Sequence, residues 1–599
     1  MSRTKDCFLI GDLQTAALVS KDAAIEWLCL PYFDSPSVFA GLLDNRGGRF
    51  ELMMPRLGIA SRYAEDAAIV EHVCKDGASE FLLRDFMVPQ PVEHCRRHVL
   101  VRKLTATRGA STVAFLFDPR PDYAQMSPVI REHGSRLRVA IENDLLLLHV
   151  PARATIERQD RGYKIVLPIA EGDSQSLILE YLVNGDHQGK EAYDVRDYEE
   201  QTLAFWKRWL GKITFFDFYR GQQMRSIMTL KLLQFYPTGA IVAAPTTSLP
   251  DDLGGTRNWD YRYVWIRDAT FTLYAFHIYN CVEEAKRFFE FIHKVTEQGD
   301  RNSFGMNLIY TIWGEEVPRE RTLNHLSGYR GSRPVRIGNN ATNQFQLDIY
   351  GDLIDAYYFM SKKETAGLAM DKKLSLTLVE RIAENWKRMD SGIWEFRGGP
   401  QHYTYSKVMC WVGVDRILRR SEELGLTSRE QARYQRLRDE ISKWIWDNCY
   451  IPEKQIFCQY PEAGHLDATN FLFVLLQFLD KHDPLTKPII RNTCQRLCRN
   501  DVFVYRYLAE DGLQGQDNPF VLCTFWMICA WAILEDIDRA ERLFRTVETY
   551  ITDSGLLSEQ MNPETGEYLG NYPQAFSQLG LLMSVYYLEK YRRRKEGDR

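Results

Sequence analysis

Short apolar runs separated by turn-forming residues fill the first part of the chain. Four of them are Ala68–Val70, His98–Val101, Thr112–Phe117 and Leu145–Val150. Runs of this length and spacing are typical of antiparallel strands in a sandwich of two sheets. We therefore predict an N-terminal antiparallel β-sandwich domain over residues 1–192.

The pattern then changes to a helical period. The stretch 194–210 places apolar residues on one side of a helix, and these are Tyr198, Leu203, Trp206 and Leu210. We predict a linker helix and connection over residues 193–220.

From residue 221 to residue 599 the helical period continues almost throughout, with loops rich in Gly, Pro and aromatic residues. The predicted helices cover 224–235, 270–280, 282–298, 345–360, 374–389, 406–424, 428–448, 468–479, 518–534, 537–550 and 576–588. This number of helices fits a barrel of two concentric helix rings, although periodicity alone fits another all-α arrangement equally well. In such a barrel the loops at one end form the site.

Composition excludes several classes of function. The chain has 599 residues, more than one core holds, so two or more domains are expected. Its 75 Lys and Arg against 80 Asp and Glu give a net charge of −5, so there is no electrostatic reason to bind nucleic acid or an anionic membrane. No zinc, EF-hand, phosphate-loop or dinucleotide-binding motif occurs, so we expect no metal and no cofactor.

The sequence also indicates a compartment. The opening residues MSRTKDCFLIGDLQT contain no uninterrupted apolar segment and no small-residue cleavage site, so we expect a cytoplasmic protein. Its 12 cysteines are then expected to be reduced and buried. The uncharged stretch Asn518–Leu534 is only just long enough to span a bilayer, and a buried helix of the helical domain is the better interpretation.

The segment Leu253–Asp268, LGGTRNWDYRYVWIRD, has the greatest density of aromatic and charged residues. Arg267 and Asp268 can form charge-assisted hydrogen bonds with sugar hydroxyls. Tyr261 and Trp265 offer flat faces for stacking on a sugar ring. A structural Arg–Asp pair among core aromatic residues would explain the same pattern equally well.

Two glutamates lie in loops with the composition of a site. Glu395 follows Trp394 in the glycine-rich segment Gly392–Pro400, where contact with the indole would raise the pKa of the carboxyl group. Such a carboxyl suits a general acid. Glu559 follows an apolar pair in Gly555–Gln560, which indicates partial burial. A glutamate in a loop is usually solvated, however, so residue chemistry alone selects neither.

Several segments follow one another in a recognisable order. They are IGDLQTAALVSKDAAIEWLCLPYFDSPSVFAGLLD, RNWDYRYVWIRDATFTL, GYRGSRPVRIGN, GIWEFRG, YSKVMCWVGVDR, NPFVLCTFW and GLLSEQMNPETGEYLGNYPQAFSQLGL. Together they resemble glycoside hydrolase family 15, the glucoamylase family, and most closely its prokaryotic glucoamylases and trehalases. The resemblance spans nearly the whole chain.

The resemblance implies a fold and a set of site residues. The N-terminal part would be a β-sandwich and the C-terminal part an (α/α)6 barrel. Glu395 matches the family's general acid, and Glu559 matches its general base. Arg267 and Asp268 match the pair that holds the terminal glucose. The further substrate-binding residues are Tyr261, Trp265, Arg333, Trp394 and Arg506.

The resemblance also implies an inverting, exo-acting hydrolase that releases glucose from the non-reducing end of α-1,4- and α-1,6-linked oligosaccharides. In the inverting reaction, the two carboxyl groups stand roughly 6.5–9.5 Å apart. The general base, here Glu559, must stay ionised. The segment Gly331–Pro334 lacks the tryptophan that fungal members carry there, so no platform for long starch chains is expected.

The alternative within the family is an α,α-trehalase, and the sequence does not separate the two. An inverting disaccharide phosphorylase and a non-catalytic sugar-binding protein are more distant alternatives. The expected partner is a small-molecule α-glucoside or oligosaccharide, with no indication of an oligomeric state.

Overall fold

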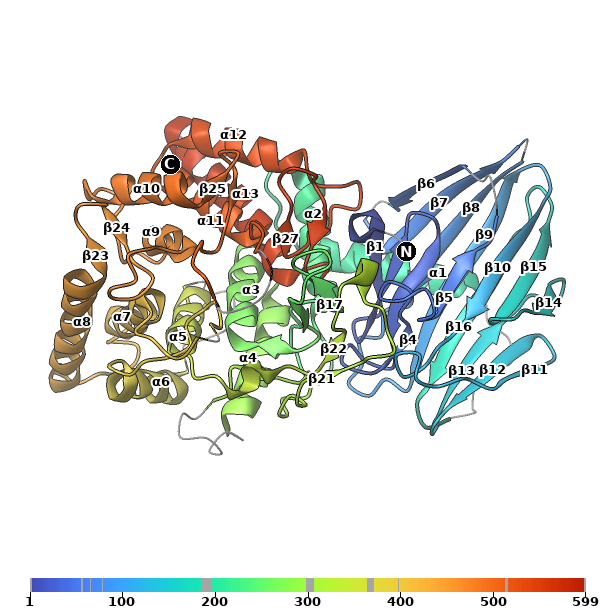
Figure 1. Cartoon of the computed structure of the whole chain (residues 1–599), viewed down its shortest axis with the longest axis horizontal. Helices are drawn as coiled ribbons and strands as arrows, with labels where there is room; N and C mark the ends of the chain where they lie inside the picture. The colour runs from blue at the N-terminus through green and yellow to red at the C-terminus, as the bar shows by residue number, and fades with distance from the viewer. Residues whose placement is uncertain are drawn as a thin grey trace.

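The computed structural model describes residues 3–54, 58–64, 66–77, 79–185, 195–297, 306–362, 371–396, 398–511, 515 and 517–596. These residues form a β-rich body and a helical body that lie end to end (Figure 1). The predicted domain boundary at residue 192 lies outside the described residues.

The β-rich body consists of two antiparallel sheets of eight strands each within the described residues. The first sheet contains β1 (Cys7–Gly11), β2 (Ala16–Ser20), β3 (Ala24–Cys29), β5 (Arg49–Leu52), β10 (Ser111–Asp118), β15 (Tyr163–Ile169) and β14 (Thr155–Arg158) in this order, with β4 (Ser37–Phe39) paired to β3. The second sheet contains β11 (Ile130–His133), β12 (Arg136–Ile141), β13 (Asp144–His149), β16 (Ser174–Leu182), β9 (Arg97–Arg108), β8 (Ser79–Met87), β7 (Ile69–Asp76) and β6 (Gly58–Tyr63).

Alternation of side chains explains how the sheets pack. In β10, Val113, Phe115 and Phe117 are buried, while Ala114 and Leu116 between them are only half-buried. Side chains two positions apart share one face of a strand. The buried set belongs to the core enclosed between the two sheets.

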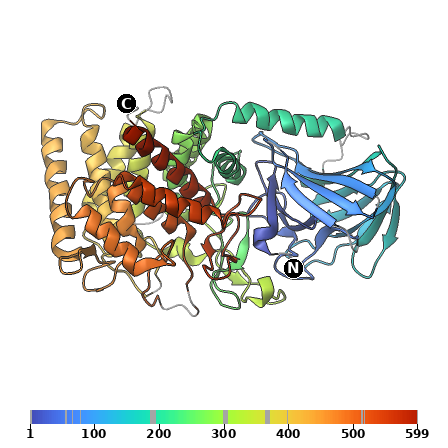
Figure 2. The same cartoon turned by 90° about the horizontal axis from the view of Figure 1, so that it is seen from above.

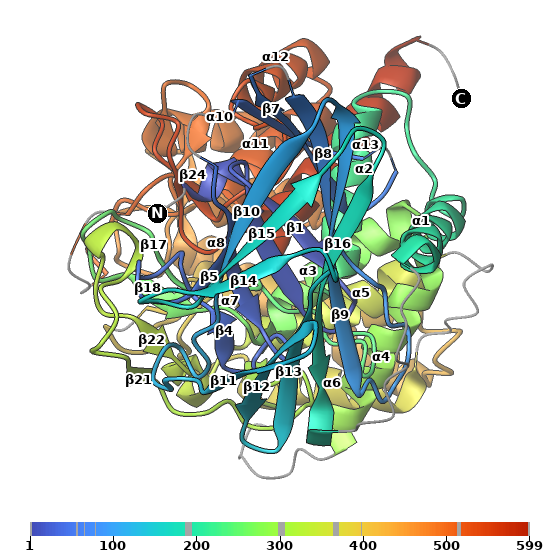
Figure 3. The same cartoon turned by 90° about the vertical axis from the view of Figure 1, so that its right-hand side faces the viewer.

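The sandwich and the helical body share a second apolar core. Leu9, Leu18 and Trp27 of the first sheet belong to one cluster with buried residues of the helices. The Trp27 indole donates a hydrogen bond of 2.8 Å to the carbonyl of Pro245. Viewed from the sandwich side, the strands lie across the end of the helical body (Figure 3). The sandwich is therefore a packed part of the molecule.

The helix α1 (Val195–Leu210) connects the two bodies and extends across their junction on one side of the molecule (Figure 2). Near its start, Glu199 accepts a 2.8 Å hydrogen bond from Arg84 of β8. Near its end, Trp209 donates a 2.8 Å hydrogen bond to Glu284. One helix is thereby fixed to both bodies.

The remaining helices form two concentric rings. The inner ring contains α3 (Ile266–Ile278), α5 (Asp348–Met360), α7 (Thr404–Arg419), α9 (Leu472–Leu475) with the preceding 3-10 turn Ala468–Phe471, α11 (Val521–Ile533) and α13 (Ala575–Glu596). The outer ring contains α2 (Arg220–Leu233), α4 (Val282–Glu297), α6 (Lys372–Asn385), α8 (Ser428–Cys449), α10 (Thr486–Leu497) and α12 (Ile537–Glu548). Helix α13 packs on both α11 and α3, which closes the inner ring. The predicted β-sandwich followed by an (α/α)6 barrel is confirmed.

Helix α11 settles the interpretation of the uncharged stretch 518–534. Every residue of α11 is buried within the barrel, as expected for an apolar helix surrounded by other helices. In the described part of the chain, no helix combines the length and the apolar character that crossing a bilayer requires. All 12 cysteines are free thiols, and all of them are buried except Cys498, which is half-buried.

Two helices differ from the prediction. The predicted helix 468–479 is only the 3-10 turn and the short α9, because Gln477 adopts a φ of 61° and the chain leaves the helical path. Helix α10 was not predicted. Its Pro488 lies in the first turn, where a missing N–H is tolerated.

Candidate active site

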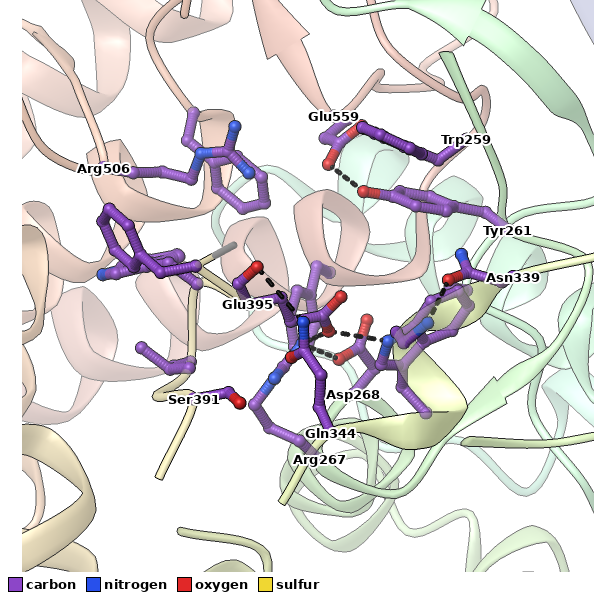
Figure 4. Close-up of a pocket in the computed structure, with 18 of the residues that line it drawn as sticks. Trp259, Tyr261, Arg267, Asp268, Asn339, Gln344, Ser391, Glu395, Arg506 and Glu559 are labelled. Atoms are coloured by element: carbon purple, nitrogen blue, oxygen red, sulfur yellow. Dashed lines mark hydrogen bonds and ion pairs between the residues drawn. The ribbon is translucent and has the colours of Figure 1, made fainter. Parts of the chain in front are cut away.

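A cavity of about 430 Å³ opens where the chain enters the inner helices of the barrel (Figure 4). Its wall comes from the connections that precede α3, α5, α7, α11 and α13. Each of these connections runs from an outer helix to the next inner helix. Residues far apart in sequence therefore meet at one end of the barrel.

Eight of the nine predicted site residues line this cavity. They are Tyr261, Trp265, Arg267, Asp268, Trp394, Glu395, Arg506 and Glu559. Arg333 is exposed and is not part of the wall. The turn that carries it is held by its neighbour Ser332, whose hydroxyl accepts a 2.9 Å hydrogen bond from the backbone N–H of Gly254. Ser332 is buried, while the arginine side chain points to solvent.

Glu559 is fully enclosed on one side of the cavity. The Tyr261 hydroxyl donates a 2.7 Å hydrogen bond to its Oε1 atom (Figure 4). Its Oε2 atom is buried and accepts no conventional hydrogen bond from the described residues. Burial raises the pKa of Glu559, while the charge of Arg506 and the Tyr261 hydrogen bond oppose this rise. An ionised Glu559 therefore depends on its neighbours.

Gly570 provides the space for the Glu559 carboxyl group. It lies after β28 (Tyr568–Leu569), which pairs with β27 (Gln560–Met561) directly after Glu559. A Cβ atom at position 570 would lie 2.5 Å from Glu559 Oε2, and the φ of Gly570 is 72°. A side chain here would displace the carboxyl group.

We expect Gly570→Ala to lower kcat by about 10²-fold if Glu559 acts in the reaction, because a displacement of about 1 Å has effects of that size. The matched control is Gly566→Ala. Gly566 has a φ of 63°, but its added Cβ would meet only Tyr550 at 3.5 Å. Steady-state rates and melting temperatures of both variants separate displacement of Glu559 from backbone strain. Equal losses of kcat in the two folded variants would contradict the prediction.

The carboxyl group of Glu395 is held by two donors that both approach the same oxygen. The Trp265 indole donates to Oε1 at 2.8 Å, and the Arg267 guanidinium donates to the same atom at 3.2 Å. The Gln344 amide donates to the backbone carbonyl of Glu395 at 3.3 Å. Glu395 has a φ of 59°, a conformation that is strained for a residue with a side chain. The surrounding hydrogen bonds therefore hold this carboxyl group in position against the backbone strain.

The loop before Glu395 is fixed from the opposite side. The Trp394 indole donates a 3.0 Å hydrogen bond to Asp467 Oδ2. Asp467 is buried and also accepts hydrogen bonds from the backbone and hydroxyl of Thr469. Asp467 therefore holds the tryptophan ring in the cavity wall.

Arg267 and Asp268 lie in the first turn of α3. The Arg267 guanidinium approaches Asp268 Oδ1 to 3.2 Å and donates a 3.0 Å hydrogen bond to Gln346. Asp268 Oδ1 is buried and accepts no well-aligned hydrogen bond from the described residues. The Arg267 guanidinium is thus the charged partner of this oxygen, and the Asp268 side chain lines the cavity. Burial raises the pKa of Asp268 to about 7, against the opposing charge of Arg267.

The raised pKa of Asp268 predicts how stability depends on pH. Between the ordinary value of 3.8 and about 7, the folded state holds a proton that the unfolded state releases. This group therefore makes the free energy of unfolding fall as pH rises from about 4 to 7, with no further change above. We expect the melting temperature of Asp268→Asn to fall less over this range than that of the wild type. If the melting temperatures of the two proteins changed equally with pH between about 4 and 7, the raised pKa of Asp268 would be contradicted.

The structure adds residues that the sequence analysis did not select. One of them is Asp517, which forms a bidentate ion pair with the selected residue Arg506 through hydrogen bonds of 3.0 and 2.6 Å. Asp251, Trp259, Asn339 and Gln344 line the cavity. The polar segment IGNNATNQ before α5 could have indicated Asn339 and Gln344. The acidic pair in SLPDDLGG could have indicated Asp251.

Known proteins resemble the chain over its whole length. A profile of the glycosyl hydrolases family 15 matches residues 218–536 and 533–586, and a profile described as trehalase-like, N-terminal, matches residues 3–206. Proteins named trehalase from Mycobacterium tuberculosis and Mycolicibacterium smegmatis are 33% and 34% identical, over 97% of this chain and 88% and 90% of theirs. One named trehalase from Thermoplasma volcanium is 31% identical over 97% of this chain and 93% of its own.

A solved structure resembles the whole architecture. The crystal structure of a bacterial glucoamylase complexed with acarbose has a TM-score of 0.70, covering 98% of this chain and 94% of that chain. The two sequences are 14% identical. At this identity the likeness concerns the fold, in which a sandwich precedes a helical barrel.

Proposed function

Because the chain belongs to the glycosyl hydrolases family 15, we propose that it is an α,α-trehalase that cleaves trehalose into two glucose molecules with inversion. The observation that carries this proposal is the near full-length match to relatives named trehalase at 31–34% identity. The N-terminal profile, described as trehalase-like, supports it. The interpretation as a glucoamylase is supported only by a similar fold at 14% sequence identity. Trehalose therefore replaces α-glucan oligosaccharides as the first substrate to test.

Glu395 is the proposed general acid. Because Trp265 and Arg267 both donate to Oε1, that atom acts as an acceptor, and the transferable proton belongs on Oε2. The proton moves to the glycosidic oxygen as its bond to the anomeric carbon breaks. The leaving glucose therefore departs as a neutral alcohol.

Glu559 is the proposed general base. It removes a proton from a water whose oxygen bonds to the anomeric carbon on the face opposite the leaving group. The Tyr261 hydroxyl holds the accepting carboxylate. Asp268 and Arg267 are proposed to bind hydroxyls of the glucose unit that is cleaved, and Trp394 and Arg506 to complete the wall around the sugars.

The test is product analysis by proton NMR before the anomers of glucose equilibrate. Inverting hydrolysis of trehalose gives one β-glucose, from the attacked unit, and one α-glucose, from the leaving unit. Trehalose, maltose, isomaltose and starch are compared at equal concentration, with and without phosphate. A higher kcat/KM for maltose would favour the glucoamylase function, and formation of a sugar phosphate would favour the phosphorylase. Two α-glucose products would exclude inversion.

A further inference from the structure

The cavity contains an additional acidic side chain beside Glu559 that the proposed chemistry does not use. Asp251 follows β17 (Thr247–Pro250), lines the cavity and is 3% exposed. Its backbone is fixed on both sides, because its N–H donates to the backbone carbonyl of Arg257 and its carbonyl accepts from the side-chain amide of Asn518. A buried carboxyl group in such a fixed position requires either a counter-charge or a proton.

The positive charge nearest to Asp251, that of Arg506, is shared with Asp517. Arg506 lies 3.8 Å from Asp251 Oδ2, but its guanidinium is already hydrogen-bonded in two places to Asp517. The charged or titratable groups around Asp251 are Glu559, Arg506, Asp517, Arg257 and, on the far side of Glu559, Tyr261. Arg257 is itself paired with Asp511 at 2.5 and 2.9 Å. Both nearby arginines therefore have closer carboxylate partners than Asp251.

Asp251 and Glu559 are brought together by neighbouring strand ends. The backbone N–H of Gly570 donates a 2.7 Å hydrogen bond to the carbonyl of Pro250, the residue before Asp251. Gly570 also lies against Glu559 Oε2, as described above. This oxygen is the one that Tyr261 does not reach. The carboxyl groups of Asp251 and Glu559 interact with each other, and Oε2 of Glu559 still requires a donor.

We propose that Asp251 is a positioning residue that carries a proton and donates it in a hydrogen bond to Oε2 of Glu559, so that the general base is held between Asp251 and Tyr261. This inference rests on the proposed function, because it takes Glu559 as the base. Each carboxylate oxygen has two lone pairs, so the Glu559 carboxylate can still accept a hydrogen bond from the attacking water. Asp251 itself does not contact the reacting atoms.

The assignment of the proton to Asp251 follows from the unequal surroundings. Two adjacent carboxyl groups in a buried site cannot both ionise easily. Burial, followed by the charge of Glu559, raises the pKa of Asp251 well above its ordinary value. Burial raises the pKa of Glu559, but the charge of Arg506 and the hydrogen bond from Tyr261 oppose this rise. The proton is therefore held by Asp251, and Glu559 is the ionised partner.

The first experiment detects the proton without any reaction. Infrared difference spectra of the wild type and Asp251→Asn at neutral pH should show one protonated-carboxyl C=O band that the variant lacks. The other buried acids are common to both proteins and cancel. Absence of this band in the difference spectrum would overturn the proposal even if the wild type hydrolyses trehalose. Conversely, a wild type that hydrolyses no α-glucoside would refute the proposed function and leave the infrared result valid.

The second experiment tests positioning through the pH profile of kcat/KM. Asp251→Ala removes the donor, so kcat should fall about 10–100-fold and the acidic limb should move to higher pH, because the Glu559 carboxylate loses a stabilising hydrogen bond. Asp251→Asn keeps a neutral donor and should remain within about threefold of the wild type. Asp252→Ala, next in the chain and outside the cavity wall, controls for disturbance of the loop. An unshifted acidic limb in folded Asp251→Ala, or equal losses in the Ala and Asn variants, would overturn the proposal.

Discussion

Replacing Glu559 or Glu395 by glutamine should lower kcat for trehalose by at least about 10²–10⁴ while the protein stays folded. Glutamine has nearly the shape of glutamate and keeps an oxygen that can accept from Tyr261 or from Trp265. It can neither remove a proton from water at position 559 nor deliver one to the glycosidic oxygen at position 395. The loss should therefore appear in kcat, measured as initial glucose release from trehalose.

Glu564 provides the matched control for Glu559. It lies in the same hairpin between β27 and β28, but its side chain is 69% exposed. Glu564→Gln should leave kcat within a few-fold of the wild type. If Glu559→Gln were as active as Glu564→Gln, Glu559 would not be the base and the proposed mechanism would have to be abandoned.

Asp268→Asn should produce the second large loss, with kcat/KM for trehalose falling by up to about 10⁴–10⁵, the range in which hydrogen-bonding sites discriminate against substrates without a partner group. Asp268 lines the cavity in the first turn of α3, where its carboxylate can accept a charge-assisted hydrogen bond from a substrate hydroxyl. The amide also removes the negative charge that faces Arg267. The measurement is kcat/KM above pH 7, where Asp268 of the wild type is mostly ionised.

A series of monodeoxy trehaloses identifies the hydroxyl concerned. The wild type should discriminate strongly against one deoxy analogue, and Asp268→Asn should have lost that discrimination, because the side chain and the hydroxyl then act as a pair. A folded Asp268→Asn enzyme with unchanged kcat/KM for trehalose would show that Asp268 does not bind the substrate.

Much of the fold could be predicted from the sequence because its elements have strong periods. The short apolar run of β10 and the uninterrupted apolar character of α11 are set locally, and both were recognised. The short α9 was overestimated because its end is set by the left-handed conformation of Gln477, which no apolar pattern encodes. The missed helix α10 contains Pro488, which usually indicates a break.

The candidate site was harder to predict, because its geometry exists only after folding. Glu395 and Glu559 were selected by the resemblance of their segments, since a glutamate in a loop is usually solvated and residue chemistry alone selected neither. Arg333 was selected in the same way, yet it points out of the cavity. A motif does not specify which side of a turn its side chain occupies. Asp251 was not selected, because its neighbour Glu559 is distant in the sequence.

The apolar core that the sandwich shares with the barrel has a consequence for biosynthesis. The first sheet, with Leu9, Leu18 and Trp27, emerges from the ribosome before α2, the helix that packs on β1, has been made. At about 5–20 residues per second, the chain from the end of β15 to the end of α2 takes about 3–13 s to make. During this interval the nascent chain exposes a surface suited to aggregation. Slower translation lengthens this interval, so we expect the yield of native protein to depend on translation speed.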